Sequence, residues 1–142
     1  MKVTFPGFVD LQVNGFAGVD FNTPGLSADS IHAAVAALRA TGVTRCLPTL
    51  ITSSFGDFAS CAKSILACND HAFAGLHMEG PYISPEEGAR GAHPLGQVIP
   101  PSVEDFNRRQ DAAQGRILLV TLAPEVPRAI QLDRRASCRD RV

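Results

Sequence analysis

The chain of 142 residues has no long apolar run, no secretion signal and no paired cysteine motif. A membrane-spanning helix needs about 20 consecutive apolar residues, and no segment approaches that length, so we expect no membrane association. The N-terminal MKVTFPGFVD contains one lysine but no apolar signal core, which favours a cytoplasmic protein. None of the four cysteines lies in a CxxC pair, and reduced, mostly buried thiols are therefore expected.

A basic C-terminal segment is the marked charge asymmetry in a chain whose net charge is only −1. Residues 128–142 hold five of the 13 basic residues, whereas the rest of the chain carries more acidic than basic groups. A basic tail can bind nucleic acid, but this one has no aromatic residue to stack on bases, so we expect no nucleic-acid partner. The change in composition divides the chain into 1–127 and a divergent, arginine-rich tail at 128–142.

Hydrophobic periodicity predicts strands that alternate with helices. We expect strands at 8–13, 43–50, 72–78 and 117–122. Strands joined by single helices form right-handed βαβ units, which place the strands parallel in one sheet. Two architectures fit this α/β pattern, an open doubly wound sheet and a (β/α)8 barrel. A full barrel needs about 250 residues, so four strands are about half of one.

The expected helices have apolar faces and recognisable ends. The first starts after Ser27 or Asp29 and stops before Gly42, the second covers 54–68, and the third starts at Ser102 and stops near Gly115. Ser102 with an acid three residues later resembles a capping box. The inward side chains of the first two helices are Ile31, Ala34, Val35, Leu38, Phe58, Ala62, Ile65 and Leu66. The continuous apolar run 117–122 is typical of a strand buried on both faces.

Polar residues fall where the predicted strands end, the edge that holds the functional site in both architectures. Six share this location: Asp10, Gln12, Asn14, His77, Glu79 and Glu125. Residues two apart on a strand point the same way, so His77 and Glu79 can face one metal or one substrate. Amides at 12 and 14, in place of histidines, argue against a second metal, because amides are weak ligands for transition metals.

Each of these residues also has an ordinary structural explanation. Glu79 suits a loop carboxylate, and a lone histidine such as His77 more often satisfies hydrogen bonds than it binds a metal. Gln12 and Asn14 suit hydrogen bonds to the loop backbone, and Glu125 suits an exposed position. His93 lies in the proline-rich loop 79–101, and loops over a rigid scaffold often contact ligands. The residues alone leave both explanations open.

Four segments occur together in this chain: PGFVDLQVNGFAGVDF (6–21), GVTRCLPTLITSS (42–54), GLHMEGPYISPEEGARGAHP (75–94) and VTLAPE (120–125). In content and order they resemble the N-acetylglucosamine-6-phosphate deacetylases, members of the amidohydrolase superfamily. The resemblance covers about residues 5–127. The combination is specific, although VTLAPE by itself would be a weak signal.

This resemblance implies a (β/α)8 barrel with a small flanking β-domain, of which the chain contains about the first four strands. It implies a metal-dependent amidohydrolase that converts N-acetylglucosamine 6-phosphate to glucosamine 6-phosphate and acetate, with one divalent metal ion, expected to be Zn²⁺. Glu79 matches the family's metal-ligand glutamate, and Ala92 and His93 match a substrate-contact segment. The expected partner is an amino sugar phosphate, and a family-type homo-oligomer is compatible with the match.

The family's two histidine ligands and its catalytic aspartate lie on later strands, so no catalytic residue is expected in this chain. A catalytic zinc normally keeps three protein ligands, and this chain supplies one by resemblance. Two hypotheses follow: the sequence belongs to a working deacetylase, or the chain as given is an inactive, truncated part of one. A shifted reading frame or chimeric end would explain the tail. A half-barrel would also leave strand edges and apolar faces uncovered.

Overall fold

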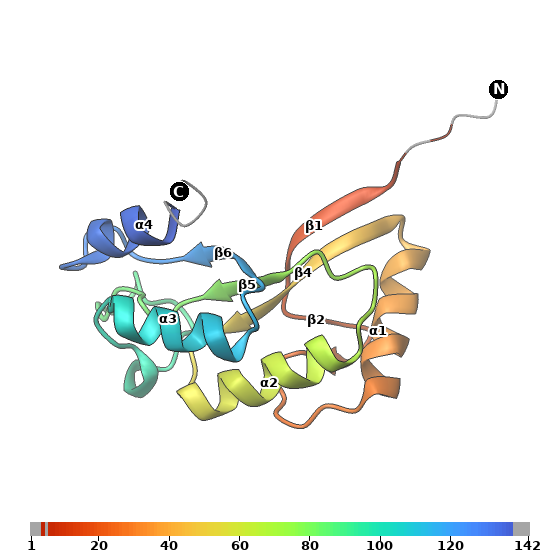
Figure 1. The fold of residues 1–142 in the computed structure, drawn as a ribbon, viewed down its shortest axis with the longest axis horizontal. Helices are drawn as coiled ribbons and strands as arrows, with labels where there is room; N and C mark the ends of the chain where they lie inside the picture. The colour runs from red at the N-terminus through yellow and green to blue at the C-terminus, as the bar shows by residue number, and fades with distance from the viewer. Residues whose placement is uncertain (1–3, 5, 138–142) are drawn as a thin grey trace.

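The main strands pair in the order in which they occur along the chain. The computed structural model describes residue 4 and residues 6–137, and its principal sheet is parallel, with the order β1-β4-β5-β6 (Figure 1). The four strands are β1 (Phe8–Val13), β4 (Val43–Ile51), β5 (Leu76–Glu79) and β6 (Ile117–Thr121). A short antiparallel hairpin, β2 (Gly15–Phe16) with β3 (Val19–Asp20), follows β1.

This strand order decides between the two predicted architectures. In a doubly wound sheet the order reverses partway and helices cover both faces. Here each strand pairs with the next one along the chain, and α1, α2 and α3 all lie on one side of the sheet (Figure 1). The fold is therefore the parallel sheet of a partial (β/α)8 barrel, as the sequence predicted.

Three of the helices begin where the sequence placed their caps, and a fourth, α4, was not predicted. They are α1 (Ala28–Ala40), α2 (Phe55–Ala67), α3 (Val103–Ala112) and α4 (Ala129–Ser137), with a short 3₁₀ helix, η1 (Leu95–Gln97), in the long loop. The hydroxyls of Ser27, Ser54 and Ser102 accept hydrogen bonds from backbone amides three residues later, at 3.1–3.2 Å. Gly42, which follows α1, has a φ of +95°, a conformation that suits glycine at a helix end.

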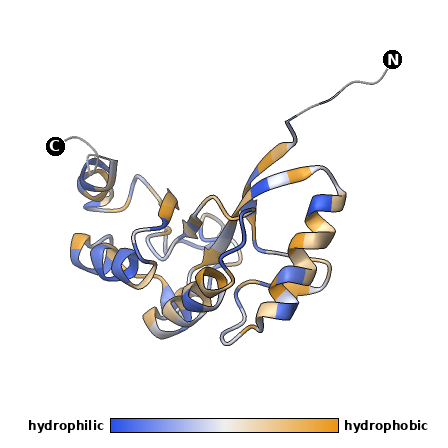
Figure 2. Ribbon diagram, turned by 45° about the vertical axis from the view of Figure 1, so that its right-hand side comes forward, coloured by the Kyte–Doolittle hydropathy of each residue, from blue (hydrophilic) through white to orange (hydrophobic). Residues whose placement is uncertain are grey.

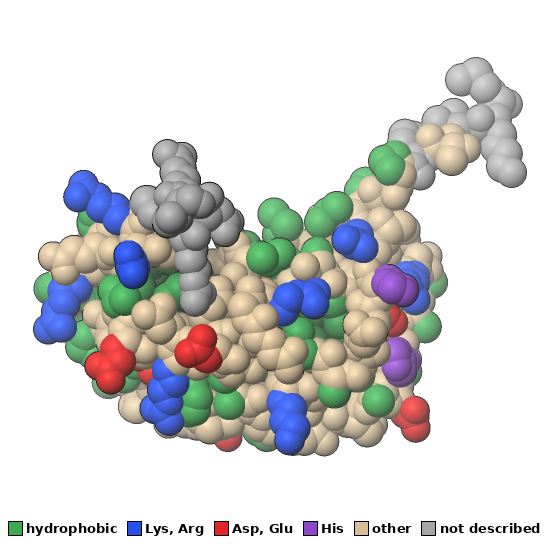
Figure 3. Space-filling view, viewed as in Figure 1, with side chains coloured by type: hydrophobic (Ala, Val, Ile, Leu, Met, Phe, Trp, Pro, Cys, Tyr) green, Lys and Arg blue, Asp and Glu red, His purple; other side chains and the backbone are tan. Residues whose placement is uncertain are grey.

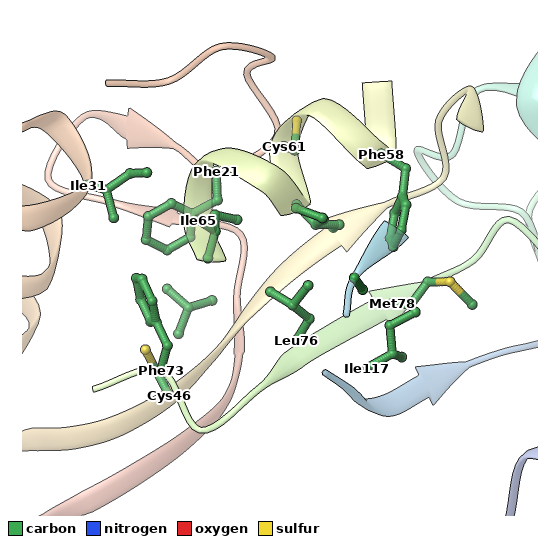
Figure 4. Packing of buried hydrophobic residues seen from close by; sticks show 14 of the residues in the cluster. Phe21, Ile31, Cys46, Phe58, Cys61, Ile65, Phe73, Leu76, Met78 and Ile117 are labelled. Atoms are coloured by element: carbon green, nitrogen blue, oxygen red, sulfur yellow. The ribbon is translucent and has the colours of Figure 1, made fainter. Parts of the chain in front are cut away.

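Apolar side chains pack between the sheet and its three helices. Cys46, Leu50, Leu76 and Met78 point from the strands toward this core, and each is at most 1% exposed. Figure 4 shows Cys46, Leu76 and Met78 against Ile31 from α1, Ile65 from α2 and other core residues. Figure 2 shows that each helix carries both hydrophilic and hydrophobic residues, as expected for helices with one buried side. All inward positions predicted for α1 are buried, whereas Leu66 of α2 is only partly buried.

The opposite face of the sheet, here called the open face, is not covered by any helix of the described residues (Figure 1). Val9 and Leu11 of β1 are 59% and 56% exposed, and Leu119 of β6 is 36% exposed. Figure 3 shows hydrophobic side chains along the upper border of the molecule, beside β1. The prediction that β6 is buried on both faces is therefore wrong. It is the last strand of the described sheet, and Leu118 and Leu119 are exposed, whereas Ile117 and Val120 pack on the core.

Two other local predictions need correction. The third strand was expected from residue 72, but β5 begins at Leu76, and only an isolated bridge joins Phe73 to Cys46. The backbone breaks its regular pairing at Gly75, which is pressed so closely against Leu118 and the Arg116 carbonyl that a side chain there would overlap them. The Ser102 capping box is half formed, because the Asp105 carboxylate contacts Tyr82 and Arg109 instead of returning to Ser102.

The C-terminal segment adds one more helix. In α4, Ala129 and Leu132 are buried, whereas Ile130 is 52% exposed. The proposed division of the chain after residue 127 remains a prediction, and residues 138–142, including Cys138, lie outside the described part. The other three cysteines are free thiols. No helix in the described residues is long and apolar enough to cross a membrane.

Candidate functional site at the carboxyl edge of the sheet

A sharp turn follows β5 and sets the position of Glu79. Gly80 has a φ of +86°, and any side chain there would overlap the hydroxyl of Thr52, so the turn requires glycine. The Gly80 amide donates to the carbonyl of Thr121 at 3.0 Å, and the Ala123 amide donates to the carbonyl of Tyr82 at 2.9 Å. These bonds tie the turn to the end of β6 and hold the Glu79 carboxylate at the edge of the sheet.

The long loop brings His93 beside Glu79. The Nε2 atom of His93 lies 4.0 Å from an Oε1 oxygen of Glu79, and the two side chains are 17% and 19% exposed. The other ring nitrogen of His93, Nδ1, is buried and has no hydrogen-bond partner. Fourteen positions separate the two residues in the sequence, and the loop places them together at the carboxyl edge of a parallel sheet. This is the edge where barrel enzymes hold their active sites.

A local network shapes the loop that carries His93. Arg90 donates from its guanidinium to the His93 carbonyl at 2.8 Å, and its amide donates to the Glu86 carbonyl at 2.9 Å. The Nε atom of Arg90 is also buried without a partner. Ala92, the other residue predicted to contact substrate, is exposed next to His93. Buried polar atoms without partners are unusual, and these two leave hydrogen-bonding capacity in the loop that the described residues do not use.

His77 serves a different purpose from Glu79, although both lie on β5. Its side chain is 2% exposed and hydrogen-bonds to groups on three other strands. Burial lowers the pKa of His77, while the nearby Glu79 charge and the hydrogen bond to Leu11 act in the opposite direction. Both ring nitrogens are engaged within the protein, so the structural explanation of this histidine is the correct one.

On the β1 side of the edge, an asparagine that the sequence did not single out makes the connections. The side chain of Asn22 donates to the backbone carbonyls of Asn14 and Thr49 and accepts from the Ile51 amide at 2.8 Å. The sequence predicted that the side chains of Gln12 and Asn14 would make such backbone contacts, but both residues are exposed. Asn22 is half-buried two residues after the end of the hairpin, and an amide there has no periodic signal.

Asp10 and Glu125 do not join Glu79. Asp10 pairs with Cys46 on β4, while Glu79 pairs with Ile51 five residues further along the same strand, roughly 16 Å away at 3.3 Å per residue. Asp10 therefore lies partway down the sheet, and its expected place at the edge is wrong. Glu125 follows β6 at the correct end but is exposed.

The donor set at this edge is small. Within the described residues, no three side chains of histidine, cysteine, aspartate or glutamate gather closely enough to hold a metal ion. The Glu79 carboxylate suits one ligand position, because it ends a strand, faces the open side and has a polar neighbour in His93. A catalytic zinc normally keeps three protein ligands, so the described residues alone do not complete such a site.

Comparison with known proteins connects this edge to one enzyme family. No protein-family model matches the chain. The N-acetylglucosamine-6-phosphate deacetylase of Lysinibacillus sphaericus is 33% identical over 131 residues, which are 89% of this chain and 33% of that protein. A crystal structure of the N-acetyl-D-glucosamine-6-phosphate deacetylase from Mycobacterium smegmatis superposes with a TM-score of 0.78, at 31% identity over 89% of this chain and 35% of that one.

Over the part that it covers, the chain belongs to the N-acetylglucosamine-6-phosphate deacetylases. It spans about a third of the length of the curated relatives that it matches. A second structure of the Mycobacterium smegmatis deacetylase contains N-acetyl-D-glucosamine-6-phosphate. An N-acetylgalactosamine-6-phosphate deacetylase from a Shewanella strain is 34% identical over 84% of the chain, so deacetylases of two amino sugar phosphates share this region.

Proposed function

We propose that this chain supplies the metal-ligand carboxylate and the substrate loop of a metal-dependent deacetylase that acts on N-acetylglucosamine 6-phosphate. One observation supports this more than any other: Glu79 from β5 and His93 from the long loop converge to 4.0 Å at the carboxyl edge of the sheet. The residues that family resemblance assigns to metal and substrate are therefore neighbours. In an ordinary loop, a glutamate and a histidine 14 positions apart have no reason to meet.

The proposed reaction is hydrolysis of an acetamide. Water adds to the carbonyl carbon, the bond between carbon and nitrogen breaks, acetate leaves and the sugar amine takes up a proton. A divalent cation, when bound, polarises the carbonyl and lowers the pKa of its water. Glu79 would hold that cation through its carboxylate. His93 would orient the acetamide, because its Nδ1 is buried without a partner and can exchange a hydrogen bond with substrate.

We also propose that the 142-residue chain does not turn over substrate by itself. The described residues lack a complete set of metal ligands, and among them Val9, Leu11 and Leu119 on the open face of the sheet stay exposed. A misplaced or underligated cation would leave the acetamide unactivated. The cytoplasmic location and the homo-oligomer expected from the sequence remain predictions.

Acetate release from N-acetylglucosamine 6-phosphate, with added Zn²⁺, tests both proposals. The purified chain should release none, whereas residues 6–127 grafted into the matching region of the Lysinibacillus sphaericus deacetylase should give an active enzyme. In that graft, Glu79→Gln should lower kcat/KM more than about 100-fold, because even groups one shell away from a metal are worth 10- to 100-fold. His93→Ala should act mainly on KM.

Glu87→Gln is the matched control, since Glu87 is an exposed carboxylate in the same loop and should leave activity unchanged. An active graft that tolerates Glu79→Gln would remove Glu79 from the proposed site. Parallel assays with N-acetylgalactosamine 6-phosphate establish which sugar the graft prefers. Turnover by the chain alone would refute the second proposal.

A further inference from the structure

One buried side chain on the open face connects all four strands of the sheet. His77 extends from β5, and its Nδ1 lies 3.1 Å from the Leu11 carbonyl of β1 and 3.3 Å from the Thr49 hydroxyl of β4. Its Nε2 lies 2.7 Å from the Thr121 hydroxyl of β6. Because β1 and β6 are at opposite ends of the strand order, the sheet must curve around this imidazole for both contacts to form.

The chemistry of the partners fixes the protons. The Leu11 carbonyl can only accept, so Nδ1 carries a hydrogen, and in the neutral imidazole Nε2 then accepts from the Thr121 hydroxyl. Thr49 uses its own proton on the Leu47 carbonyl at 3.2 Å and accepts from the Val13 amide at 3.0 Å. The Thr49 hydroxyl oxygen therefore accepts a second, longer hydrogen bond from the Nδ1 hydrogen of His77. A neutral imidazole satisfies every group in this set.

The contacts of His77 lie at the level of the candidate site and directly below it. Glu79 is two residues further along β5 on the same face, and it pairs across the sheet with Thr121. Leu11 precedes Gln12 and Asn14, where β1 reaches the same edge. Among the partners of His77, Thr49 is thus one layer beneath the positions that a metal and substrate would contact, whereas Thr121 is level with Glu79.

We propose that His77 is a positioning residue of this site, which fixes the Glu79 carboxylate relative to the end of β1 and the His93 loop by joining β1, β4 and β6 to β5. It is not a catalytic residue, because both nitrogens are engaged and the ring is 2% exposed. Groups in the layer behind a ligand hold it in its productive orientation and affect metal affinity strongly. The inference rests on the proposed role of Glu79.

Nitrogen-15 spectra of the imidazoles in the metal-free 142-residue chain test the geometry. His77 should show a protonated Nδ1 and an unprotonated Nε2 at neutral pH. Thr121→Val removes the hydroxyl with little change in shape, and should shift the His77 Nε2 signal together with the amides of Gln12, Glu79 and His93. Thr121→Ser keeps the hydroxyl and should restore them.

Thr44→Val is the matched control, because it removes a threonine hydroxyl from β4 outside this network. It should leave those signals in place. The proposal is overturned if His77 has the other tautomer, or if Thr121→Val changes only signals next to position 121. Amide signals from α1 and α2 serve as the check that each variant is folded.

A Zn²⁺ titration followed by the Glu79 and His93 amides then measures the consequence. Thr121→Val should weaken binding about 10-fold and Thr121→Ser should not. Equal affinity in all three proteins would refute the positioning role. Binding that survives Glu79→Gln would refute the proposed function instead, and the metal-free spectra would still decide whether His77 organises the edge.

Discussion

The two faces of one sheet differ more than any two separate regions of this molecule. On the face covered by helices, Leu50 is 1% exposed and packs in a continuous core. On the open face, Leu11 is 56% exposed. Parallel strands are normally buried on both faces. The comparison shows that one face alone supplies the packing of this chain, while the other holds the polar contacts of the candidate site.

The sharpest test of this difference replaces one leucine on each face of the sheet with alanine. Leu50→Ala should lower the free energy of unfolding by about 2–5 kcal/mol, because it leaves a cavity in a packed core. Leu11→Ala removes the same atoms from a largely exposed position and should cost less than about 0.5 kcal/mol. Urea unfolding followed by circular dichroism measures both. Similar losses would show that the open face is covered in solution.

A smaller effect on the free energy of unfolding is expected from Tyr82, which lies where the helix-covered face of the sheet meets its carboxyl edge. The hydroxyl of buried Tyr82 donates to the Asp105 carboxylate at 2.8 Å, and Arg109 contacts the same oxygen at 2.8 Å and lies near the Phe58 ring. Burial, and then the charge of Asp105, raise the pKa of Tyr82 above its ordinary value. Tyr82→Phe should destabilise the chain by about 1–2 kcal/mol, because the hydrogen bond has a charged acceptor.

Urea unfolding at neutral pH checks this value, and Glu86→Gln, a change in an exposed part of the same loop, should be neutral. No loss in Tyr82→Phe would mean that Arg109 alone satisfies Asp105. In that case the contact between loop and α3 would not help to hold the edge.

The smallest loss of stability is expected from a change at Asp70, which lies at the far end of the helix-covered face. Burial opposes its charge, but the Ala72 amide, the Arg39 guanidinium and His32 outweigh that and lower the pKa of Asp70. The charged carboxylate therefore stabilises the fold above the unfolded pKa of about 4, and this contribution disappears as pH falls through the lower folded pKa. Asp70→Asn should cost about 1 kcal/mol at pH 7, since Arg39 is half exposed.

Unfolding free energies of wild type and Asp70→Asn, measured from pH 7 to pH 3, should converge as the pH falls. Asp29→Asn, an exposed acid in the first turn of α1, is the control for loss of charge alone. A difference that stays constant with pH would show that the carboxylate acts as a neutral hydrogen-bond acceptor.

The regular elements could be predicted because their signals are local. Ser27, Ser54 and Ser102 begin helices through bonds to amides three residues away, and Ile31, Val35 and Leu38 recur at helical spacing. Glu79 was found from its place at a strand end and from resemblance. Asp10 was misplaced because alternation shows that a strand exists but not how far its neighbour extends past each residue.

The amino-acid sequence by itself determined the alternation of strands and helices, the helix starts and the family to which Glu79, Ala92 and His93 point. Only the tertiary structure decided the winding of the sheet, the meeting of Glu79 with His93, and the contacts of His77 and Asn22. The physical reason is the separation along the chain over which each interaction acts. Caps and periodicity act within a few residues, whereas His77 reaches Leu11 across 66 positions, a contact that exists only after the sheet has curved.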